Sequence, residues 1–428
     1  MEGHKLRFVV RSMFLLVLVA ASGCIGDFDL GGLVPPYKDV VVRWGHTATL
    51  LADGRVLIVG GSGMSVTSGA EIYDPVSGHV AAAGLEAEAN NSRIWHWATR
   101  LSDGRVFVVG GQYFGLGVDE VPPTLVYDPQ TNIWAKAESP SGEVLGWGDG
   151  TALIPLDDGR VVLIVRLGSQ VYDPNTGHWS PIAPLLRHRT LSTVTKLQDG
   201  RVLVVGGRDK NGDLVTEVDV YDPRQNSWSV TSAARGPRNG HGAVLLDDGK
   251  VLVVGGDANA EIYEPTTGEW SFVPASFFDD ESPTATILLQ DGRIMVIGKR
   301  VFDSVGTAIV GESETLPEEQ RAPVVLYDPV ATAWKITESV PIAQWHFSSV
   351  LLADGRVLLV GGEFSVPLGA SGEVSWGNIY DPATATWTPA GKTFTYEYCF
   401  SDESQRRAAK SDSLTELTKR RILDHPCR

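Results

Sequence analysis

Short apolar runs recur along most of the chain, and an Asp-Gly pair interrupts each of them. The run LADGRVLIVGG at residues 51–61 returns as LADGRVLLVGG at residues 352–362. Such pairs begin at Asp53, Asp103, Asp158, Asp199, Asp248, Asp291 and Asp354. Asp-Gly between two β-branched runs favours a two-residue hairpin, because the tight turn requires a positive φ that glycine adopts without steric cost. The pattern therefore predicts seven β-hairpins.

Two further strands are predicted after each hairpin. The third strand ends in Tyr-Asp-Pro, or Tyr-Glu-Pro in the fifth unit, at Tyr73, Tyr127, Tyr172, Tyr221, Tyr263, Tyr327 and Tyr380. Seven residues later stands a tryptophan in six of the seven units, at Trp134, Trp179, Trp228, Trp270, Trp334 and Trp387, whereas the first unit has Val80. We interpret these aromatic residues as packing between neighbouring sheets. A four-stranded unit cannot bury both of its faces alone, so the copies must stack.

The string DGRVLVVGG, the strand that ends in tyrosine and the tryptophan at a fixed distance resemble the kelch repeat. This resemblance covers roughly residues 43–390. It implies an all-β fold, a seven-bladed β-propeller with one four-stranded antiparallel blade per repeat. The third unit ends its second strand in Leu-Ile-Val-Arg and the sixth in Gly-Lys, where the others have Gly-Gly. We count both as blades because the tyrosine and tryptophan follow in phase.

The N-terminus has the features of a secretion signal. Three basic residues precede an apolar run at residues 13–21, which is too short to span a bilayer as a mature helix. Residues 21–24, Ala-Ser-Gly-Cys, resemble the bacterial lipoprotein box, which implies cleavage after residue 23 and acylation of Cys24. Ala21 departs from the leucine that this family prefers. A plain signal peptide with a chance cysteine is the alternative.

Domain boundaries and location follow from the same resemblances. We expect a lipoprotein signal peptide at residues 1–23, an anchor linker at residues 24–42, the seven repeats at residues 43–390 and a C-terminal tail at residues 391–428. Ile25 follows the acylated cysteine where an aspartate would retain a lipoprotein in the inner membrane. The resemblance therefore implies the outer membrane or the cell surface.

Composition narrows the range of partners. The chain has 428 residues, 43% of them hydrophobic and 21% charged, as is ordinary for a folded protein. Its net charge of −16 becomes −18 once residues 1–23, with three basic residues and one acidic residue, are removed. Phosphate backbones and anionic membrane surfaces repel so acidic a protein. We expect a monomer with no nucleic-acid partner, which contacts the membrane only through its lipid anchor.

The tail changes character after the last repeat. Residues 392–400 alternate aromatic and polar positions, which predicts a strand that could close the ring, followed by a polar segment. Cys399 and Cys427 remain after acylation of Cys24. Outside the cytoplasm they could form one disulfide or stay as two separate thiols, and the sequence does not decide between these.

Connections between antiparallel strands alternate between two faces of a propeller. The Asp-Gly hairpins and the Tyr-Asp-Pro turns share one face, which we call the hairpin face, and their uniformity indicates a structural role. On the opposite face, the variable face, the connections differ in every unit, and the longest are residues 299–325 and 363–378. Binding usually occurs on variable loops held by a rigid scaffold, so we expect the ligand on the variable face.

The innermost strand of each unit begins on the variable face, beside the central channel. Its opening residues are polar or aromatic and supply our candidate ligand residues: Trp44, His46, Trp95, His96, Trp97, His188, Arg238, His241, Trp345 and His346. A polar mouth lined by aromatic rings suits a small polar ligand such as a sugar. In the alternative interpretation, each histidine caps an inner strand by bonding a backbone group.

One stretch of the seventh unit resembles a copper site. WHFSSVLLADGRVLLVGG, from Trp345, is similar to the segment of galactose oxidase and related copper radical oxidases in which a Tyr-His pair ligates copper. His346 has the place of the histidine, but Trp345 has that of the tyrosine, and an indole cannot ligate copper as a phenolate does. Those oxidases also need a cysteine crosslinked to a tyrosine within the propeller, and no cysteine lies between Cys24 and Cys399. We therefore expect no metal and no cofactor.

These patterns predict an extracytoplasmic, lipid-anchored propeller that works as a binding or scaffolding module for a protein or carbohydrate ligand, rather than as an enzyme. The alternative is a sugar-active enzyme that resembles the kelch-type sialic acid mutarotases, and copper oxidase chemistry comes third. An enzyme would need an acid and a base that converge at the channel mouth, whereas a binding module needs only shape and aromatic surface.

Overall fold

The computed structural model describes residues 5–9, 43–63, 69–84, 93–113, 122–141, 152–165, 169–256, 260–274, 283–298, 323–341, 344–345, 347–364, 371–391 and 393–399. Within these ranges, no helix is both long and apolar enough to cross a membrane. The predicted acylation of Cys24, the ligand role of His346 and the thiol of Cys427 lie outside the described residues.

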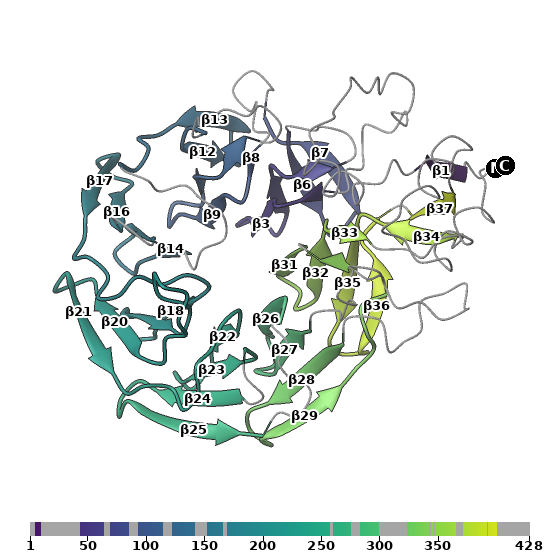
Figure 1. Ribbon diagram of the computed structural model, residues 1–428. Helices are drawn as coiled ribbons and strands as arrows, with labels where there is room; N and C mark the ends of the chain where they lie inside the picture. The colour runs from purple at the N-terminus through teal and green to yellow at the C-terminus, as the bar shows by residue number, and fades with distance from the viewer. Residues whose placement is uncertain are drawn as a thin grey trace, which may run out of the picture.

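Seven four-stranded antiparallel sheets stand around a central axis (Figure 1). Blades one to three comprise β3 (Thr47–Leu50), β4 (Val56–Val59), β6 (Ala70–Asp74) and β7 (His79–Ala82); β9 (Trp97–Arg100), β10 (Val106–Val109), β12 (Leu125–Asp128) and β13 (Ile133–Lys136); and β14 (Ala152–Pro155), β15 (Val161–Ile164), β16 (Gln170–Asp173) and β17 (His178–Pro181). Blades four and five comprise β18 (Thr193–Lys196), β19 (Val202–Val205), β20 (Val218–Asp222) and β21 (Ser227–Thr231); and β22 (Gly242–Leu245), β23 (Val251–Val254), β24 (Ala260–Glu264) and β25 (Glu269–Val273). Blades six and seven comprise β26 (Ala285–Leu288), β27 (Ile294–Ile297), β28 (Val324–Asp328) and β29 (Ala333–Ile336); and β31 (Ser348–Leu351), β32 (Val357–Val360), β35 (Gly377–Asp381) and β36 (Thr386–Pro389). Strands pair in chain order in every blade, so each sequence unit builds one whole blade and the predicted seven-bladed propeller is confirmed.

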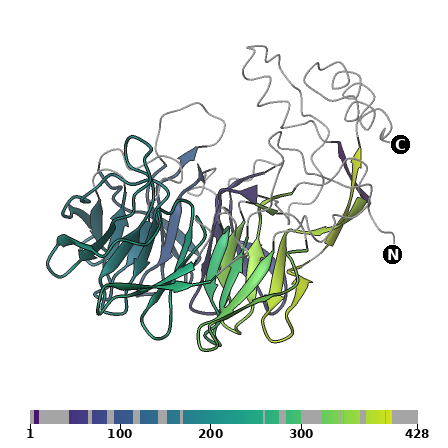
Figure 2. The same ribbon diagram turned by 60° about the horizontal axis from the view of Figure 1, so that its bottom comes forward.

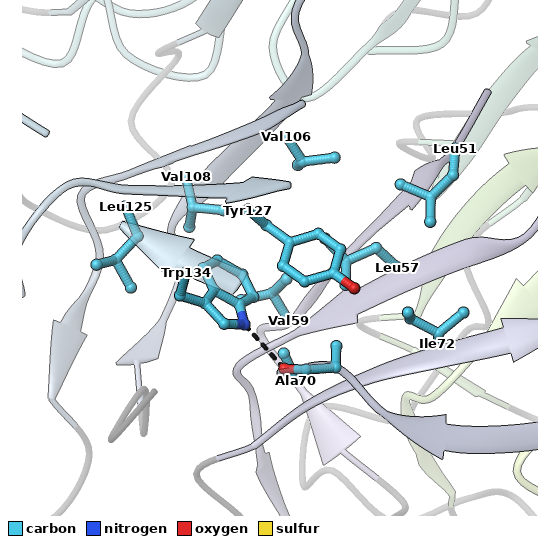
Figure 3. Close-up of a cluster of buried hydrophobic side chains, with 11 residues drawn as sticks. Leu51, Leu57, Val59, Ala70, Ile72, Val106, Val108, Leu125, Tyr127 and Trp134 are labelled. Carbon is cyan, nitrogen blue, oxygen red and sulfur yellow. Dashed lines mark hydrogen bonds between the residues drawn. The ribbon is translucent and has the colours of Figure 1, made fainter. Parts of the chain in front are cut away.

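The hydrophobic core lies between neighbouring blades. Between blades one and two, Tyr127 and Trp134 pack with Leu51 and Ile72 in one cluster of buried side chains (Figure 3). The indole Nε1 of Trp134 also donates a hydrogen bond to the carbonyl oxygen of Ala83, in blade one, at 2.8 Å. The repeated tyrosine and tryptophan therefore join adjacent sheets, as their spacing predicts.

Blade one has Val80 in place of that tryptophan, and its junction with blade seven is closed by other residues. Trp376, just before β35, meets Tyr73 edge-on, with ring centroids 4.8 Å apart and an interplanar angle of 79°. The Tyr73 hydroxyl donates a hydrogen bond to the carbonyl oxygen of Ala390 at 2.7 Å. Because β3 lies beside β31 and every blade is complete, the ring closes without exchange of a strand between blades.

The strand expected in residues 392–400 is present as β37 (Thr393–Cys399), but its position differs from the expectation. It pairs antiparallel with β34 (Ser371–Ser375) and parallel with β1 (Lys5–Val9). This three-stranded sheet lies beside blade seven, outside the ring (Figures 1 and 2). Within the described residues β37 joins no blade, so closure of the ring belongs to side chains of blades one and seven rather than to the tail. β1 lies inside the predicted signal peptide, so its pairing concerns the uncleaved chain.

Candidate functional site

The channel mouth on the variable face is built from the segments that open the innermost strands. Four of these segments begin with arginine and align with one another, at residues 43–46, 93–96, 189–192 and 238–241. In blades one and two they form short ribbons with the residues that follow the second strand: β2 (Arg43–Trp44) with β5 (Ser62–Gly63), and β8 (Arg93–Ile94) with β11 (Gln112–Tyr113). The mouth therefore has ordered backbone at its blade one and blade two edges.

The arginines of these segments are almost fully buried and bind within their own blades. Each donates a hydrogen bond to the carbonyl oxygen of a glycine that follows the second strand: Arg43 to Gly60 at 3.0 Å, Arg93 to Gly110 at 3.5 Å, Arg189 to Gly206 at 2.9 Å and Arg238 to Gly255 at 2.9 Å. Arg43, Arg189 and Arg238 also pair with Glu71, Asp219 and Glu261, which stand two residues before the repeated tyrosine. Arg238, expected to be a ligand residue, is thus only 2% exposed and held inside blade five by Glu261.

Three candidate histidines connect neighbouring blades. His46 Nε2 donates a hydrogen bond to the carbonyl oxygen of Val360 in blade seven at 3.0 Å. His96 Nε2 lies 2.8 Å from the Thr47 hydroxyl in blade one, and His241 Nε2 lies 2.8 Å from the Thr193 hydroxyl in blade four. The three rings are 5–6% exposed. His46 thus bonds a backbone group, as in the alternative interpretation, whereas His96 and His241 bond threonine side chains.

Burial sets the charge state of these histidines. Desolvation, together with the charge of nearby Arg43, lowers the pKa of His46 to about 3. Desolvation and Arg238 likewise lower the pKa of His241 to about 3, and desolvation holds the pKa of His96 well below its ordinary value. All three are therefore neutral at physiological pH, and they offer a ligand neither a positive charge nor an accessible ring.

Trp44 and Trp95 form an aromatic pair at the mouth. Both are half-buried, and their ring centroids lie 5.7 Å apart with an interplanar angle of 51°. Trp95 has a φ of 59°, in the left-handed region, where the aligned residues of blades one and five are Gly45 and Gly240. In blade four the aligned residue is Leu191, with a φ of 56°. A bulky side chain in this conformation costs about 1–3 kcal/mol, which glycine avoids.

The other candidate residues have separate environments. Trp97 is half-buried and packs on the hydrophobic cluster between blades two and three. His188 is half-buried at the opening of blade four. For Trp345 the structure describes only the backbone, in β30 (Gln344–Trp345), which pairs with β33 (Glu363–Phe364). Thus Trp44 and Trp95 are the candidate side chains that the described structure brings together at the mouth.

Sequence reasoning missed a pocket on the hairpin face. Its volume is about 410 Å³, and it lies among the Asp-Gly hairpins of blades one to three and the end of β18 in blade four, with Arg100, Pro155 and Lys196 in its lining. The repeat contained a signal for this pocket, because Arg100, Pro155 and Lys196 occupy a position that is leucine in the other four blades. Those leucines are Leu50, Leu245, Leu288 and Leu351. The uniform length of the hairpins concealed this difference in side chains.

Metal ligands do not gather in the described part of the chain. No group of three or more His, Cys, Asp or Glu side chains there could hold a metal ion. The buried carboxylates near the mouth, those of Asp219 and Glu261, face buried arginines instead. The two residues of the copper resemblance are not among these, because His346 and the side chain of Trp345 lie outside the described part of the chain.

Comparisons with known proteins matched one family model to part of the chain and returned a solved structure of low sequence identity. A family model of the kelch motif matches residues 197–232, the second to fourth strands of blade four with the hairpin that precedes them. No curated protein matches the chain by sequence. A solved structure of a novel fungal alcohol oxidase of the AA5 family, in complex with copper, matches over 83% of this chain and 66% of that chain, with 15% sequence identity and a TM-score of 0.47.

Proposed function

Since the chain is a seven-bladed β-propeller of kelch repeats, we propose that it is a binding module that holds a carbohydrate ligand at the channel mouth of the variable face. The observation that carries this proposal is the Trp44–Trp95 pair. Blade two has a tryptophan where blades one and five have glycine, in a conformation that favours glycine. Strained backbone of this kind clusters at functional sites, and of the two strained non-glycine residues in these segments, Trp95 and Leu191, only Trp95 carries an aromatic side chain.

The geometry of the pair suits a sugar ring. Two half-buried indoles at 51° present an angled aromatic surface beside the channel. Aromatic faces are large apolar surfaces with a polar N–H at one edge, so they can stack on the C–H face of a pyranose while nearby polar groups bond its hydroxyls. Trp44 and Trp95 would supply the stacking surface, and the variable loops would supply specificity.

A binding role explains the side chains found at the channel mouth better than a catalytic role does. An enzyme such as a mutarotase needs an acid and a base that reach the substrate. In the described residues the buried carboxylates of Asp219 and Glu261 are neutralised by Arg189 and Arg238. The neutral histidines bond neighbouring blades. The mouth offers a shaped aromatic surface, which is sufficient for recognition.

We propose that this module works outside the cytoplasm, anchored by lipid on Cys24 at the outer membrane or cell surface. The support is the basic n-region, the apolar run and Ala-Ser-Gly-Cys at residues 21–24. Cys24→Ser should release the protein from the membrane pellet into the soluble fraction after cell fractionation. A Cys24→Ser protein that stays in the pellet would contradict the anchor without bearing on the ligand site.

Trp95→Gly tests the ligand site. Glycine fits the left-handed backbone at this position, so the variant should melt within a few degrees of the parent. On a glycan array, and then by titration with the best-bound glycan, it should bind about 1–3 kcal/mol more weakly, the range for loss of an aromatic anchor. The protein for these assays lacks residues 1–24.

Leu191→Gly is the matched control. It relieves the same left-handed strain in blade four but leaves both indoles in place. We expect it to bind the glycan as the parent does. Equal affinities for the parent and Trp95→Gly, or a parent that binds no glycan on the array, would contradict the proposed function.

A further inference from the structure

The hairpin-face pocket lies at the opposite end of the channel from Trp44 and Trp95. Arg100 is the last residue of β9, Pro155 of β14 and Lys196 of β18, the innermost strands of three successive blades. Leu101 and Leu156, which are buried, also line it. The volume of about 410 Å³ falls within the range of small-molecule sites. The lining of the pocket therefore combines apolar and cationic side chains.

The repeat shows that these side chains are not required by the scaffold. Four blades end the innermost strand with leucine, namely Leu50 in blade one, Leu245 in blade five, Leu288 in blade six and Leu351 in blade seven. The three departures fall in consecutive blades, and all three line the pocket. A blade folds with leucine at this position, so arginine and lysine here call for an explanation other than stability.

One cationic side chain at the pocket remains after the ion pairs are counted. Lys196 forms an ion pair with Asp157, and Asp103, which also lines the pocket, pairs with Arg105 at 2.6 Å. Arg100 is exposed, and its guanidinium donates a hydrogen bond to the carbonyl oxygen of Leu50 at 3.4 Å. Within the described ranges Arg100 has no ion pair. The local charge is therefore close to +1, on a protein whose net charge is −16.

We propose that this pocket binds a small organic acid through its carboxylate. The planar guanidinium of Arg100 matches a carboxylate with two parallel hydrogen bonds, and the ammonium of Lys196 adds attraction from the far side of the pocket. The carbon skeleton of the acid covers Leu101 and Leu156. A single net positive charge favours a monoanion over a phosphate dianion, because the second negative charge would face Asp103 and Asp157.

The test is calorimetric titration of the protein that lacks residues 1–24 with D-glucuronate at low ionic strength and pH 8, where inorganic phosphate is mainly a dianion. D-Glucose serves as the matched neutral probe and inorganic phosphate as the dianion. We expect glucuronate to bind at least tenfold more tightly than either. Arg100→Leu places in blade two the residue that four other blades carry, so it should fold, and it should weaken glucuronate binding at least tenfold. Arg100→Gln provides a second variant, which keeps a polar side chain and removes only the charge.

Trp95→Gly separates this pocket from the carbohydrate site on the variable face. It should leave glucuronate binding unchanged, whereas Arg100→Leu should leave glycan binding at the other face unchanged. Absence of glucuronate binding by the parent, equal binding of glucose, tighter binding of phosphate, or unchanged affinity in Arg100→Leu and Arg100→Gln would each overturn the proposal. A loss of glucuronate binding in Trp95→Gly alone would place the acid on the variable face, and the hairpin-face assignment would be wrong.

Discussion

At the scale of single residues, burial of the channel histidines makes the free energy of unfolding depend on pH. An unfolded chain takes up a proton on histidine near pH 6.5, whereas His46 and His241 in the folded protein do so only near pH 3. Between these values the unfolded state binds more protons, so the free energy of unfolding falls as the pH drops below 6.5. Each such histidine contributes a slope of about 1.4 kcal/mol per pH unit in this window.

We therefore expect His241→Gln to flatten the pH dependence of stability. Urea unfolding between about pH 6 and 5 should give a slope that is smaller than the parent's by about 1.4 kcal/mol per pH unit. His79→Gln, on the exposed outer strand of blade one, is the control and should keep the parent slope. If the His241→Gln and parent profiles ran parallel, His241 would not be held neutral by burial in the folded protein.

The sequence located these histidines but could not show which way they face. A polar residue at the opening of an inner strand can point into the channel or against the next blade, and its spacing is the same in both cases. In the structure, the rings of His96 and His241 lie against the glycine pair of the preceding blade. A Cβ added at Gly60 or Gly206 would lie 2.7 or 2.8 Å from the Cε1 atom of His96 or His241. The left-handed backbone of Trp95 was more accessible to prediction, since Gly45 and Gly240 align with it.

At the scale of strands and blades, the local sequence pattern predicted the positions of almost all strands in the propeller. Asp-Gly turns and the phased tyrosine and tryptophan located the strands, and blades three and six form although their second strands lack Gly-Gly. The partner of β37 was not predictable, because β34 lies in the long variable connection of blade seven and has no repeat to align with. Pairing between segments outside the repeat depends on tertiary position rather than on local sequence.

Gly206 tests how strictly the blade needs its glycine pair. A Cβ there would lie 2.6 Å from the carbonyl oxygen of Arg238 in the next blade, and its φ is 64°. Gly206→Val should therefore lower the free energy of unfolding by about 3 kcal/mol or more, from backbone strain and the clash together. Gly212→Val is the matched control, because Gly212 also has a positive φ but has no atom within 4 Å of an added Cβ. It should cost less, about 1–2 kcal/mol, in the same thermal or urea melt.

At the scale of the whole molecule, the ring separates a shared scaffold from two distinct channel ends. The shared positions bury apolar side chains between blades, while departures from the repeat gather at Trp95 on the variable face and at Arg100 on the hairpin face. The propeller holds these groups on rigid strands at opposite ends of one channel. Ligands at the two ends should therefore bind independently, because neither site shares a side chain with the other.

The structure assigns closure of the ring to particular residues. If the strand predicted at residues 392–400 closed the ring, a chain ending at Gly391 would be clearly less stable. In the structure, β37 pairs outside the blades, whereas Tyr73, Trp376 and Ala390 all remain in that shortened chain. We now expect its melting temperature to stay within a few degrees of the parent value.

Trp376→Ala should instead lower the melting temperature clearly, because Trp376 is 6% exposed and fills the junction where the first unit lacks its tryptophan. Truncation of a buried tryptophan costs about 3–5 kcal/mol. Loss of this contact would also loosen blades one and seven and expose strand edges, which promotes aggregation. Differential scanning calorimetry with light scattering would compare the two proteins side by side. A chain ending at Gly391 that melts as early as Trp376→Ala would show that the tail sheet, and not the junction of blades one and seven, holds the ring together.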